Sequence, residues 1–354
     1  MTAPLRIVHV LNHVRQTGNG IVNVVVDLAC AQAEAGNQVL VLSVGGEYET
    51  LLAQCGVVHE KLDQRRNPAN ILAAVLRFRR IVRQYRPDVV HAHMVTGVVL
   101  AAVARVGLRY RLVATVHNVL DISSNLMGLA DRVIAVSQAV SRSMRRRGIP
   151  ARKLRVVLNG TRGNKRARLV DAAPPADLEH PAITTVAGMY KNKGIDVLIR
   201  AFTDVARESP AAHLYIVGDG PDRASFERKA ARSTAASRIH FEGFVSDPQR
   251  YLSATDVFVL PSFRESFGLV LGEAREAGCA IVASRVDGIP EALDDGEAGI
   301  LVAAGDHASL ATCISELLRD PSLLQQWRLR AGRQLDRLNI NRVCGETLSV
   351  YTEV

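Results

Sequence analysis

The sequence has little cysteine and few aromatic residues. Among its 354 residues there is no Cys-x-x-Cys pair, and the five cysteines are Cys30, Cys55, Cys279, Cys313 and Cys344. This pattern excludes a disulfide scaffold, a zinc ribbon and a dithiol redox motif, and it indicates reduced thiols in a cytoplasmic protein. Hydrophobic residues make up 48% of the chain and charged residues 22%, which is the composition of a folded globular protein.

Long hydrophobic runs are also absent. The mostly apolar run Leu5–Leu11 is short and leads into Asn12 and His13, while Met94–Ala104 stops at Arg105. A membrane-spanning helix needs about 20 apolar residues, and a secretory signal has a basic start before its apolar core. We therefore expect neither a transmembrane span nor a secretory signal.

Basic residues outnumber acidic ones by 44 to 35, which gives a net charge of +9 and a pI of about 9.6. Twelve basic residues and no acidic one lie between Arg132 and Arg168. A second cluster on the expected helix Asn70–Tyr85 contains Arg77, Arg79, Arg80 and Arg83, with Arg86 beyond it and with Ile71, Val75, Phe78 and Val82 on the other face. The clusters fit either a solvated surface or docking on an anionic membrane at the inner face of the plasma membrane. Aromatic residues are only 5% of the chain, so no nucleic acid is expected as a partner.

Short β-branched runs alternate with helical patterns, which predicts parallel sheets covered on both faces. The expected strands of the first half are Arg6–Leu11, Val39–Val44, Val89–His93, Leu112–His117 and Val133–Val136, with helices at Ile21–Ala35 and Asn70–Tyr85. After a polar linker at residues 160–180, the second half has strands at Ile183–Ala187, His213–Val217, Ile239–Glu242, Val257–Leu260 and Ala280–Ser284, with helices at Ile195–Arg207 and Phe267–Ala277. We predict an α/β fold of two Rossmann-like, doubly wound parallel-sheet domains that face each other across a deep cleft.

The segment Pro261–Ala274 (PSFRESFGLVLGEA) is typical of a strand–loop–helix unit that binds an anion. Glu265 precedes the expected helix, and Glu273 lies two turns inside it. A phosphate can bind at such a helix start without a metal, and here the free N–H groups would come from Phe267, Gly268 and Leu269.

The Glu-x7-Glu spacing of this segment resembles the signature of the family 4 retaining glycosyltransferases (glycosyl transferases group 1), which have the GT-B fold. Other segments resemble the same family in the same order over essentially the whole chain, namely Pro87–His93, Val116–His117, Ala130–Ser137, Asn159–Gly160, Gly218–Arg223, Phe241–Val245, Ala254–Ser262, Gly288–Glu291 and Gly299–Val302. The resemblance implies a metal-independent enzyme with no cofactor, whose substrate is a UDP- or GDP-linked nucleotide sugar.

The resemblance also implies roles for single residues. Glu265 would contact hydroxyls of the donor sugar, Lys193 would neutralise the donor diphosphate, and His117 would lie close to the transferred sugar. Glu273 would bind the ribose of the donor. The other implied donor-binding positions are Gly18 and Gly20 in the first glycine loop, Gly218 in a Gly-Asp-Gly-Pro turn, Gly243 and Phe244 in the base-side loop, and Phe267, Gly268 and Leu269.

Met189 departs from the family, which usually has an arginine directly after the glycine at this point. One positive charge on the diphosphate is then missing, or Lys191 or Arg264 supplies it. His91 and His93 flank Ala92 at a strand end, but no third metal ligand lies nearby in the sequence, so a structural or substrate-proximal role is favoured over a metal site.

These observations predict a retaining glycosyltransferase that transfers a sugar from a nucleotide-diphosphate donor to a hydroxyl of a glycan or lipid-linked glycan, in cell-surface polysaccharide or lipopolysaccharide biosynthesis. The expected domains are 1–163 on the acceptor side and 164–335 for the nucleotide sugar, with a helix at 336–354 that crosses back onto the first. Two alternatives stay open. One is another GT-B enzyme such as a nucleotide-sugar epimerase, and the other is an inactive relative that serves as a binding subunit.

Overall fold

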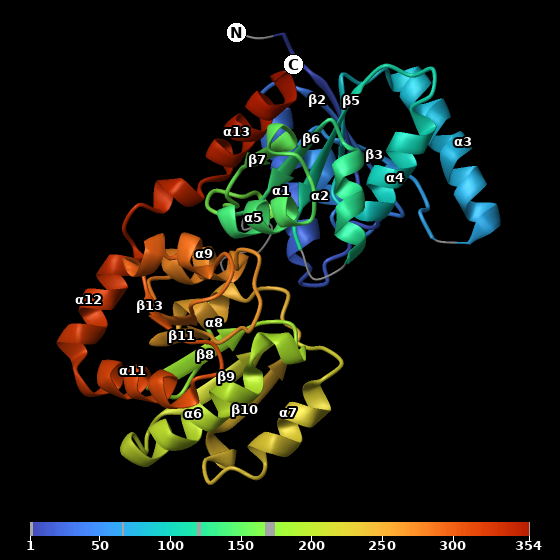
Figure 1. The fold of residues 1–354 in the computed structure, drawn as a ribbon. Coiled ribbons are helices and arrows are strands. Elements are labelled where there is room, and N and C mark those ends of the chain that lie inside the picture. Colours follow the sequence, from blue (N-terminus) through green and yellow to red (C-terminus); the bar gives the residue numbers. More distant parts are fainter. Residues whose placement is uncertain (1–2, 66, 119–121, 167–173, 354) are drawn as a thin grey trace. The chain divides into compact units, whose positions relative to one another are not determined.

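The computed structural model describes residues 3–65, 67–118, 122–166 and 174–353 (Figure 1). The chain divides into two units, one of Met1–Leu169 with Leu338–Val354 and one of Val170–Arg337. The second unit ends at 337 where the sequence suggested 335, and the division between the units near the predicted 163 falls among residues that are not described. Residues 167–173 of the predicted linker, with Arg168 of the basic run, lie outside the described residues.

The first unit is built on a seven-stranded parallel sheet with the order β3-β2-β1-β4-β5-β6-β7. Its strands are β1 (Arg6–Val10), β2 (Gln38–Ser43), β3 (Val58–Lys61), β4 (Val89–Ala92), β5 (Arg111–Val116), β6 (Arg132–Ala135) and β7 (Leu154–Val156). Its helices are α1 (Gly20–Glu34), α2 (Glu49–Gln54), α3 (Pro68–Tyr85), α4 (Val95–Ala104), α5 (Gln138–Arg146) and α13 (Ile340–Thr352), with 3-10 turns η1 (Ile122–Leu129) and η2 (Ala151–Lys153). In the central strand, Ile7 pairs with Val39 on one side and with Val89 on the other, and these β-branched residues are buried. Such runs form strands because both faces of a parallel sheet are covered.

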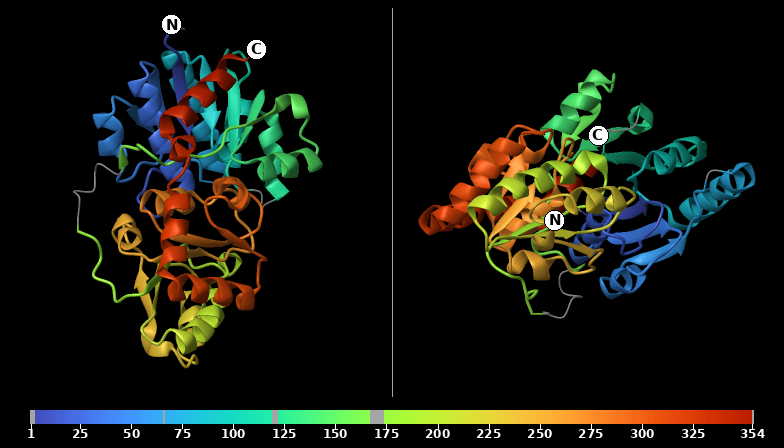
Figure 2. Two further views of the ribbon diagram at one scale, coloured as in Figure 1. Left: turned by 90° about the vertical axis from the view of Figure 1, so that its left-hand side faces the viewer. Right: turned by 90° about the horizontal axis from the view of Figure 1, so that it is seen from below.

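The C-terminal helix α13 belongs to the first unit and lies beside α1 (Figures 1 and 2). Val343 and Tyr351 of α13 are buried in the same core as Val22 and Val25 of α1. The last residues of the chain therefore help to build the first sheet's core.

The second unit holds a six-stranded parallel sheet with the order β10-β9-β8-β11-β12-β13. Its strands are β8 (Ala182–Val186), β9 (His213–Val217), β10 (Ile239–Gly243), β11 (Val257–Leu260), β12 (Ala280–Ser284) and β13 (Ile300–Val302). Its helices are α6 (Ile195–Glu208), α7 (Arg223–Ala230), α8 (Gln249–Ser253), α9 (Leu269–Glu276), α10 (Ile289–Ala292), α11 (His307–Arg319) and α12 (Pro321–Ala331). Short 3-10 turns are η4 (Lys191–Lys193), η5 (Ala236–Arg238), η6 (Asp294–Gly296) and, at the second boundary, η7 (Leu335–Leu338).

Each sheet reverses its strand order once, between β1 and β4 in the first unit and between β8 and β11 in the second. Ligands of doubly wound sheets bind beyond the carboxyl ends of the strands at such a switch point. The loop after β8 contains Lys193 and the loop after β11 contains Glu265. In the first unit, the loop after β1 contains Gly18 and the residue after β4 is His93.

The strands and helices expected from the sequence are confirmed to within two residues at each end. Helix α3 carries the second arginine cluster, and its apolar face is covered only in part. Phe78 and Val82 are buried, whereas Ile71 is 52% exposed and its neighbours Leu72 and Leu76 are exposed as well. Among the described residues, no helix has both the length and the apolar character needed to cross a membrane.

Candidate functional site

The switch point of the second sheet carries an ion pair between two of the predicted site residues. Lys193 Nζ lies 2.6 Å from Glu265 Oε2, and the two side chains are 23% and 16% exposed. Lys193 follows β8 and Glu265 follows β11, so the reversal of strand order brings them together although 72 positions separate them. One of the three ammonium protons is directed to Glu265, which leaves the others for a further acceptor.

The loops that carry this pair are bound to each other. The Phe263 N–H donates to the Asn192 carbonyl at 2.8 Å. Gly194 has a φ of 68°, and a Cβ there would collide with the carbonyl oxygen of Pro261. Glycine is required at this position by both its backbone conformation and the close approach.

The backbone of Glu265 is held from the other side by the loop after β12. Asp287 accepts hydrogen bonds from the Glu265 N–H at 3.1 Å and from Arg264 Nε at 2.8 Å, and Gly288 N–H donates to the Glu265 carbonyl at 3.0 Å. Arg264 is therefore already paired with a carboxylate.

The helix after Glu265 starts later than expected. α9 begins at Leu269, and Gly268, with a φ of 83°, is its N-cap. The helix begins two residues after the predicted start at Phe267, because the positive φ of Gly268 is not helical. Glu273 consequently lies one turn inside α9, where it is half-buried, and not two.

The neighbouring strands β9 and β10 end at or next to two further predicted donor-binding positions, Gly218 and Gly243. Gly218 N–H donates to the Gly243 carbonyl at 2.7 Å, which joins the ends of β9 and β10. Phe244 follows and its side chain is 47% exposed. The carboxyl edge of this sheet thus gathers the loops of β8, β9, β10, β11 and β12.

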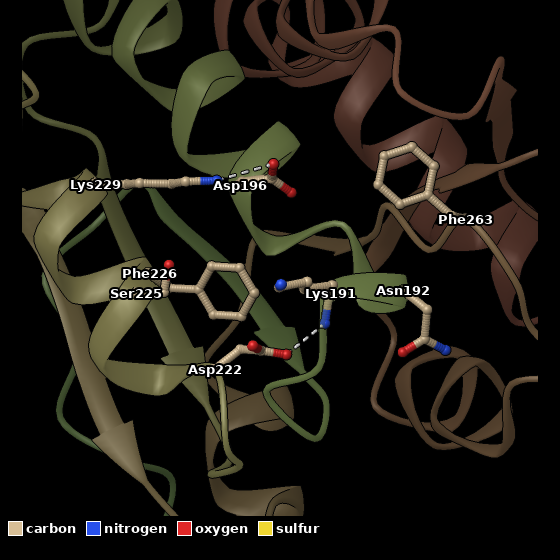
Figure 3. Close-up of a pocket in the computed structure, with 8 residues that line it drawn as sticks. All are labelled: Lys191, Asn192, Asp196, Asp222, Ser225, Phe226, Lys229 and Phe263. Atoms are coloured by element: carbon tan, nitrogen blue, oxygen red, sulfur yellow. Dashed lines mark hydrogen bonds and ion pairs between the residues drawn. The ribbon is translucent and has the colours of Figure 1, made fainter.

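A pocket of about 390 Å³ lies next to the Lys193 turn (Figure 3). It is lined by Lys191, Asn192, Asp196, Asp222, Ser225, Phe226, Lys229 and Phe263. Lys229 is paired with Asp196 at 3.2 Å, whereas Lys191 has no carboxylate within ion-pair distance in the described part of the chain. Lys193 and Glu265 do not line this pocket.

No positive charge is available at the position of the family's usual arginine, because Met189 stands there. Its side chain is fully buried in the core of the second unit, and its backbone bonds to Asp219 and Asp222. Of the two substitutes considered from the sequence, Lys191 is exposed in the turn Lys191–Lys193, whereas Arg264 is paired with Asp287.

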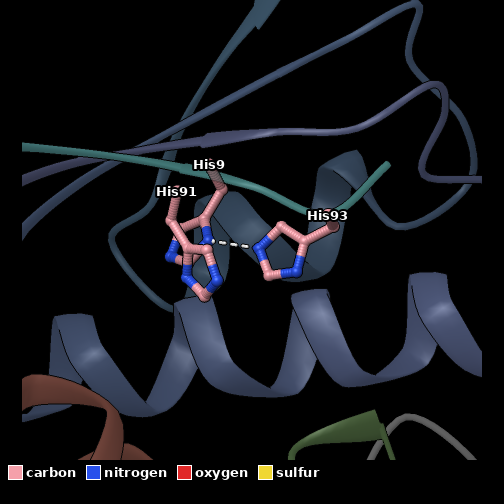
Figure 4. A group of neighbouring side chains, drawn as sticks. All are labelled: His9, His91 and His93. Carbon is pink, nitrogen blue, oxygen red and sulfur yellow. Dashed lines mark hydrogen bonds between the residues drawn. The ribbon is translucent and has the colours of Figure 1, made fainter. Parts of the chain in front are cut away.

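In the first unit, the predicted residue His117, which is half-buried, contacts a cluster of three buried histidines. Its Nε2 lies 3.1 Å from His93 Nδ1, and His93 Nε2 lies 2.9 Å from His9 Nδ1 (Figure 4). His91 bonds to Tyr351 and Thr115, both at 2.6 Å. Burial lowers the pKa of His9 to about 4 and that of His117 to about 3, and it holds the pKa values of His91 and His93 well below 6.5. All four rings are neutral at neutral pH.

His9 was missed from the sequence, although it supplies the third ring that His91 and His93 appeared to lack. One ring nitrogen of each of these three histidines lies within 4.8 Å of the other two, as metal ligands would. Each of the six nitrogens, however, already has a hydrogen-bond partner among histidines, Gln32, Tyr351 and Thr115. The donor set therefore fits a hydrogen-bond network better than a metal centre.

The glycine loop of the first unit follows β1. Gly18 has a φ of 66° and is exposed, and Gly20 is the first residue of α1. The Asn19 side chain caps that helix by accepting from the Ile21 N–H at 3.0 Å.

Two parallel doubly wound units, with the Lys193–Glu265 ion pair at the switch point of the second, are an architecture typical of nucleotide-binding α/β proteins. Residues 18–162 match the model described as Glycosyltransferase Family 4, and residues 180–320 match Glycosyl transferases group 1. The lipopolysaccharide core biosynthesis glycosyltransferase LpsD of Rhizobium meliloti (strain 1021) is 30% identical over 260 residues, which cover 72% of this chain and 71% of LpsD. LpsE of the same organism is 34% identical over 175 residues, which cover 49% of each chain. The chain therefore belongs to glycosyltransferase family 4.

Solved structures agree on the fold. Anabaena Alr3699/HepE, crystallised with UDP and glucose, has a TM-score of 0.82 at 21% identity, and the match covers 99% of this chain and 100% of that one. WaaG, a glycosyltransferase involved in lipopolysaccharide biosynthesis, has a TM-score of 0.74 at 15% identity, with 98% and 100% covered. Likenesses at these identities establish the GT-B architecture.

Proposed function

We propose that the protein is a retaining glycosyltransferase that moves a sugar from a nucleotide-diphosphate donor to a hydroxyl of a glycan or lipid-linked glycan, in cell-surface polysaccharide or lipopolysaccharide biosynthesis. The observation that carries this proposal is the Lys193–Glu265 pair at the switch point of the second sheet. Family membership and the lipopolysaccharide role of LpsD and LpsE support it.

The donor binds at the carboxyl edge of the second sheet. Lys193 and the first turn of α9 stabilise the diphosphate, with Lys191 beside them in place of the family's arginine. Glu273 accepts from the ribose, and the Gly218 and Gly243–Phe244 loops border the base. HepE has been crystallised with UDP and with UDP-glucose, which favours UDP over GDP as the nucleotide.

The reaction breaks the bond between the anomeric carbon and the diphosphate oxygen. Negative charge develops on the leaving diphosphate, where Lys193 and the helix N-terminus lower its energy, and positive charge develops on the sugar ring near Glu265. The acceptor oxygen then bonds to the anomeric carbon on the face that the diphosphate leaves, and its proton passes to a diphosphate oxygen. His117, with Gly18 and Gly20 of the first unit, completes the proposed set of substrate contacts.

The test is a thermal-shift screen with UDP-glucose, UDP-galactose, UDP-N-acetylglucosamine and GDP-mannose, followed by product analysis with a panel of glycan acceptors. A cognate donor should raise the melting temperature because it binds only the folded protein. Transfer to an acceptor would support the proposal. Conversion of the donor sugar without any acceptor would identify an epimerase, and binding without turnover over the whole panel would identify a binding subunit.

For the membrane partner, we propose the exposed face of α3 as an anionic-lipid contact. Leu72 and Leu76 are 62% and 61% exposed on the helix that carries Arg77, Arg80 and Arg83. Exposed leucines beside arginines fit the boundary between headgroups and acyl chains. The protein should co-sediment with vesicles that contain phosphatidylglycerol, and Leu72→Glu should weaken this binding. Binding that ignores both lipid charge and salt would contradict the proposal.

A further inference from the structure

A continuous hydrogen-bond chain leads from the C-terminal helix to His117. Tyr351 Oη of α13 lies 3.2 Å from Gln32 Nε2, and Gln32 Oε1 lies 2.7 Å from His9 Nε2. The chain continues from His9 Nδ1 to His93 Nε2 at 2.9 Å and from His93 Nδ1 to His117 Nε2 at 3.1 Å. His9, Gln32 and His93 are at most 2% exposed, whereas His117 is only half-buried and forms the open end.

The orientation of the Gln32 amide sets the direction of this hydrogen-bond chain. In this structure its Nε2–H donates to Tyr351, so its oxygen faces His9 and accepts a hydrogen bond. His9 must therefore carry its proton on Nε2, which leaves Nδ1 as an acceptor. A neutral imidazole has one donor and one acceptor nitrogen, so the same requirement passes to His93 and then to His117.

At the other end of this hydrogen-bond chain, the donor and acceptor roles of Tyr351 and His91 follow in the same way. Tyr351 accepts from Gln32, and its own proton needs an acceptor, which is His91 Nδ1 at 2.6 Å. His91 then donates from Nε2 to Thr115 Oγ1. Burial raises the pKa of Tyr351, so the hydroxyl keeps the proton that it donates.

We propose that Gln32 and Tyr351 are positioning residues that hold His117 as the Nε2–H tautomer, with Nδ1 as a fixed hydrogen-bond acceptor. Tyr351 orients the Gln32 amide, and Gln32 sets the tautomers of His9, His93 and His117 in turn. This inference rests on the proposed function only in giving His117 a substrate to contact.

Two properties of His117 follow. Because the chain ends on an amide oxygen, which does not take up a proton at neutral pH, it orders His117 without conducting protons away from it. Because Nδ1 carries a lone pair, His117 selects a hydroxyl or N–H of the ligand and disfavours a carboxylate at the same place.

The first test is the tautomer itself, in the unmodified full-length protein labelled with ¹⁵N-histidine. Long-range ¹H–¹⁵N spectra at neutral pH distinguish a protonated ring nitrogen from one with a lone pair, and the His117→Ala variant assigns the signals. We expect Nε2 of His117 to be protonated and Nδ1 not. The reverse tautomer, or a mixture, in the unmodified protein overturns the proposal whether or not the protein is an active transferase.

The second test uses Tyr351→Phe, which removes the hydroxyl that accepts from Gln32 and donates to His91. The freed amide can flip, so His117 should become a mixture of tautomers. Thr115→Val is the matched control, because it removes one buried hydrogen bond of the same network on the His91 branch, away from His117. A single unchanged tautomer in Tyr351→Phe, or an equal mixture in Thr115→Val, contradicts the assigned roles.

A kinetic readout separates this role from general stability. For whichever donor passes the screen, kcat of Tyr351→Phe should fall by roughly 2- to 10-fold, in proportion to the share of His117 in the wrong tautomer. The affinity for the free nucleoside diphosphate, which has no sugar, should stay unchanged. Loss of nucleotide affinity together with kcat would indicate a disturbed fold and would contradict a positioning role.

Discussion

At the scale of single residues, Lys193 is the cation that the proposed donor diphosphate needs most. Its ammonium is held by Glu265 at 2.6 Å and is 23% exposed, so it is both fixed and accessible. Lys193→Ala removes a charge-assisted hydrogen bond worth about 1.5–3 kcal/mol, which corresponds to roughly 10- to 100-fold weaker binding of UDP or GDP. Isothermal titration calorimetry measures this change. Arg319→Ala, which breaks an exposed ion pair with Glu208 in the same unit, is the control and should bind the nucleotide normally.

Glu265 should affect turnover more than nucleotide binding. Glu265→Gln keeps the shape and an oxygen that accepts from Lys193, but it removes the negative charge that faces the developing positive charge of the sugar. Lost transition-state stabilisation of this kind costs about 100-fold or more in kcat. UDP affinity should stay near normal, because the substitution also removes a negative charge that would repel the diphosphate. Glu208→Gln, which breaks an exposed ion pair with Arg319, should leave both quantities unchanged, and normal turnover in Glu265→Gln would remove Glu265 from the catalytic set.

At the scale of elements, the sequence predicts the buried strands well because continuous apolar runs such as Val257–Leu260 have few other stable environments. It does not predict the short edge strands β3, β7 and β13, since three or four residues that are mostly exposed or only partly buried carry little pattern. The family resemblance predicts Lys193 and Glu265 as site residues. It could not link His9, Gln32 and Tyr351, because they come from a strand and two helices that only the folded chain brings together.

The turn between β8 and α6 tests how far one glycine controls the site. Gly194→Ala puts a Cβ against the Pro261 carbonyl at a φ of 68°, so the Lys193 loop and the Glu265 loop must separate. Gly278→Ala is the matched control, because Gly278 has a similar φ of 77° but no atom within 4 Å of its added Cβ. The control should lose about 1–2 kcal/mol of unfolding free energy from backbone strain alone. Gly194→Ala should lose more and should also bind nucleotide more weakly, as denaturant unfolding and calorimetry would reveal. Equal losses in both variants and normal nucleotide binding would show that the loop contact is unimportant.

At the scale of the whole molecule, we expect acid to destabilise the first unit more than the second, because the first unit contains the histidine cluster. The pKa values of His9, His91, His93 and His117 lie below 6.5 in the folded state, so the unfolded chain binds more protons below that pH. Their stabilising effect is complete above pH 6.5 and is lost as the pH falls towards 4. At about pH 5.5 each fully neutral histidine costs about 1.4 kcal/mol relative to neutral pH. Calorimetry between pH 7.5 and 5.5 should therefore show the first unit melting at progressively lower temperature, while the second unit shifts less and serves as the internal reference. The nucleotide should stabilise only the second unit's transition if the donor diphosphate binds at Lys193. Equal acid shifts of both transitions would mean that the buried histidines do not set the acid stability of the first unit.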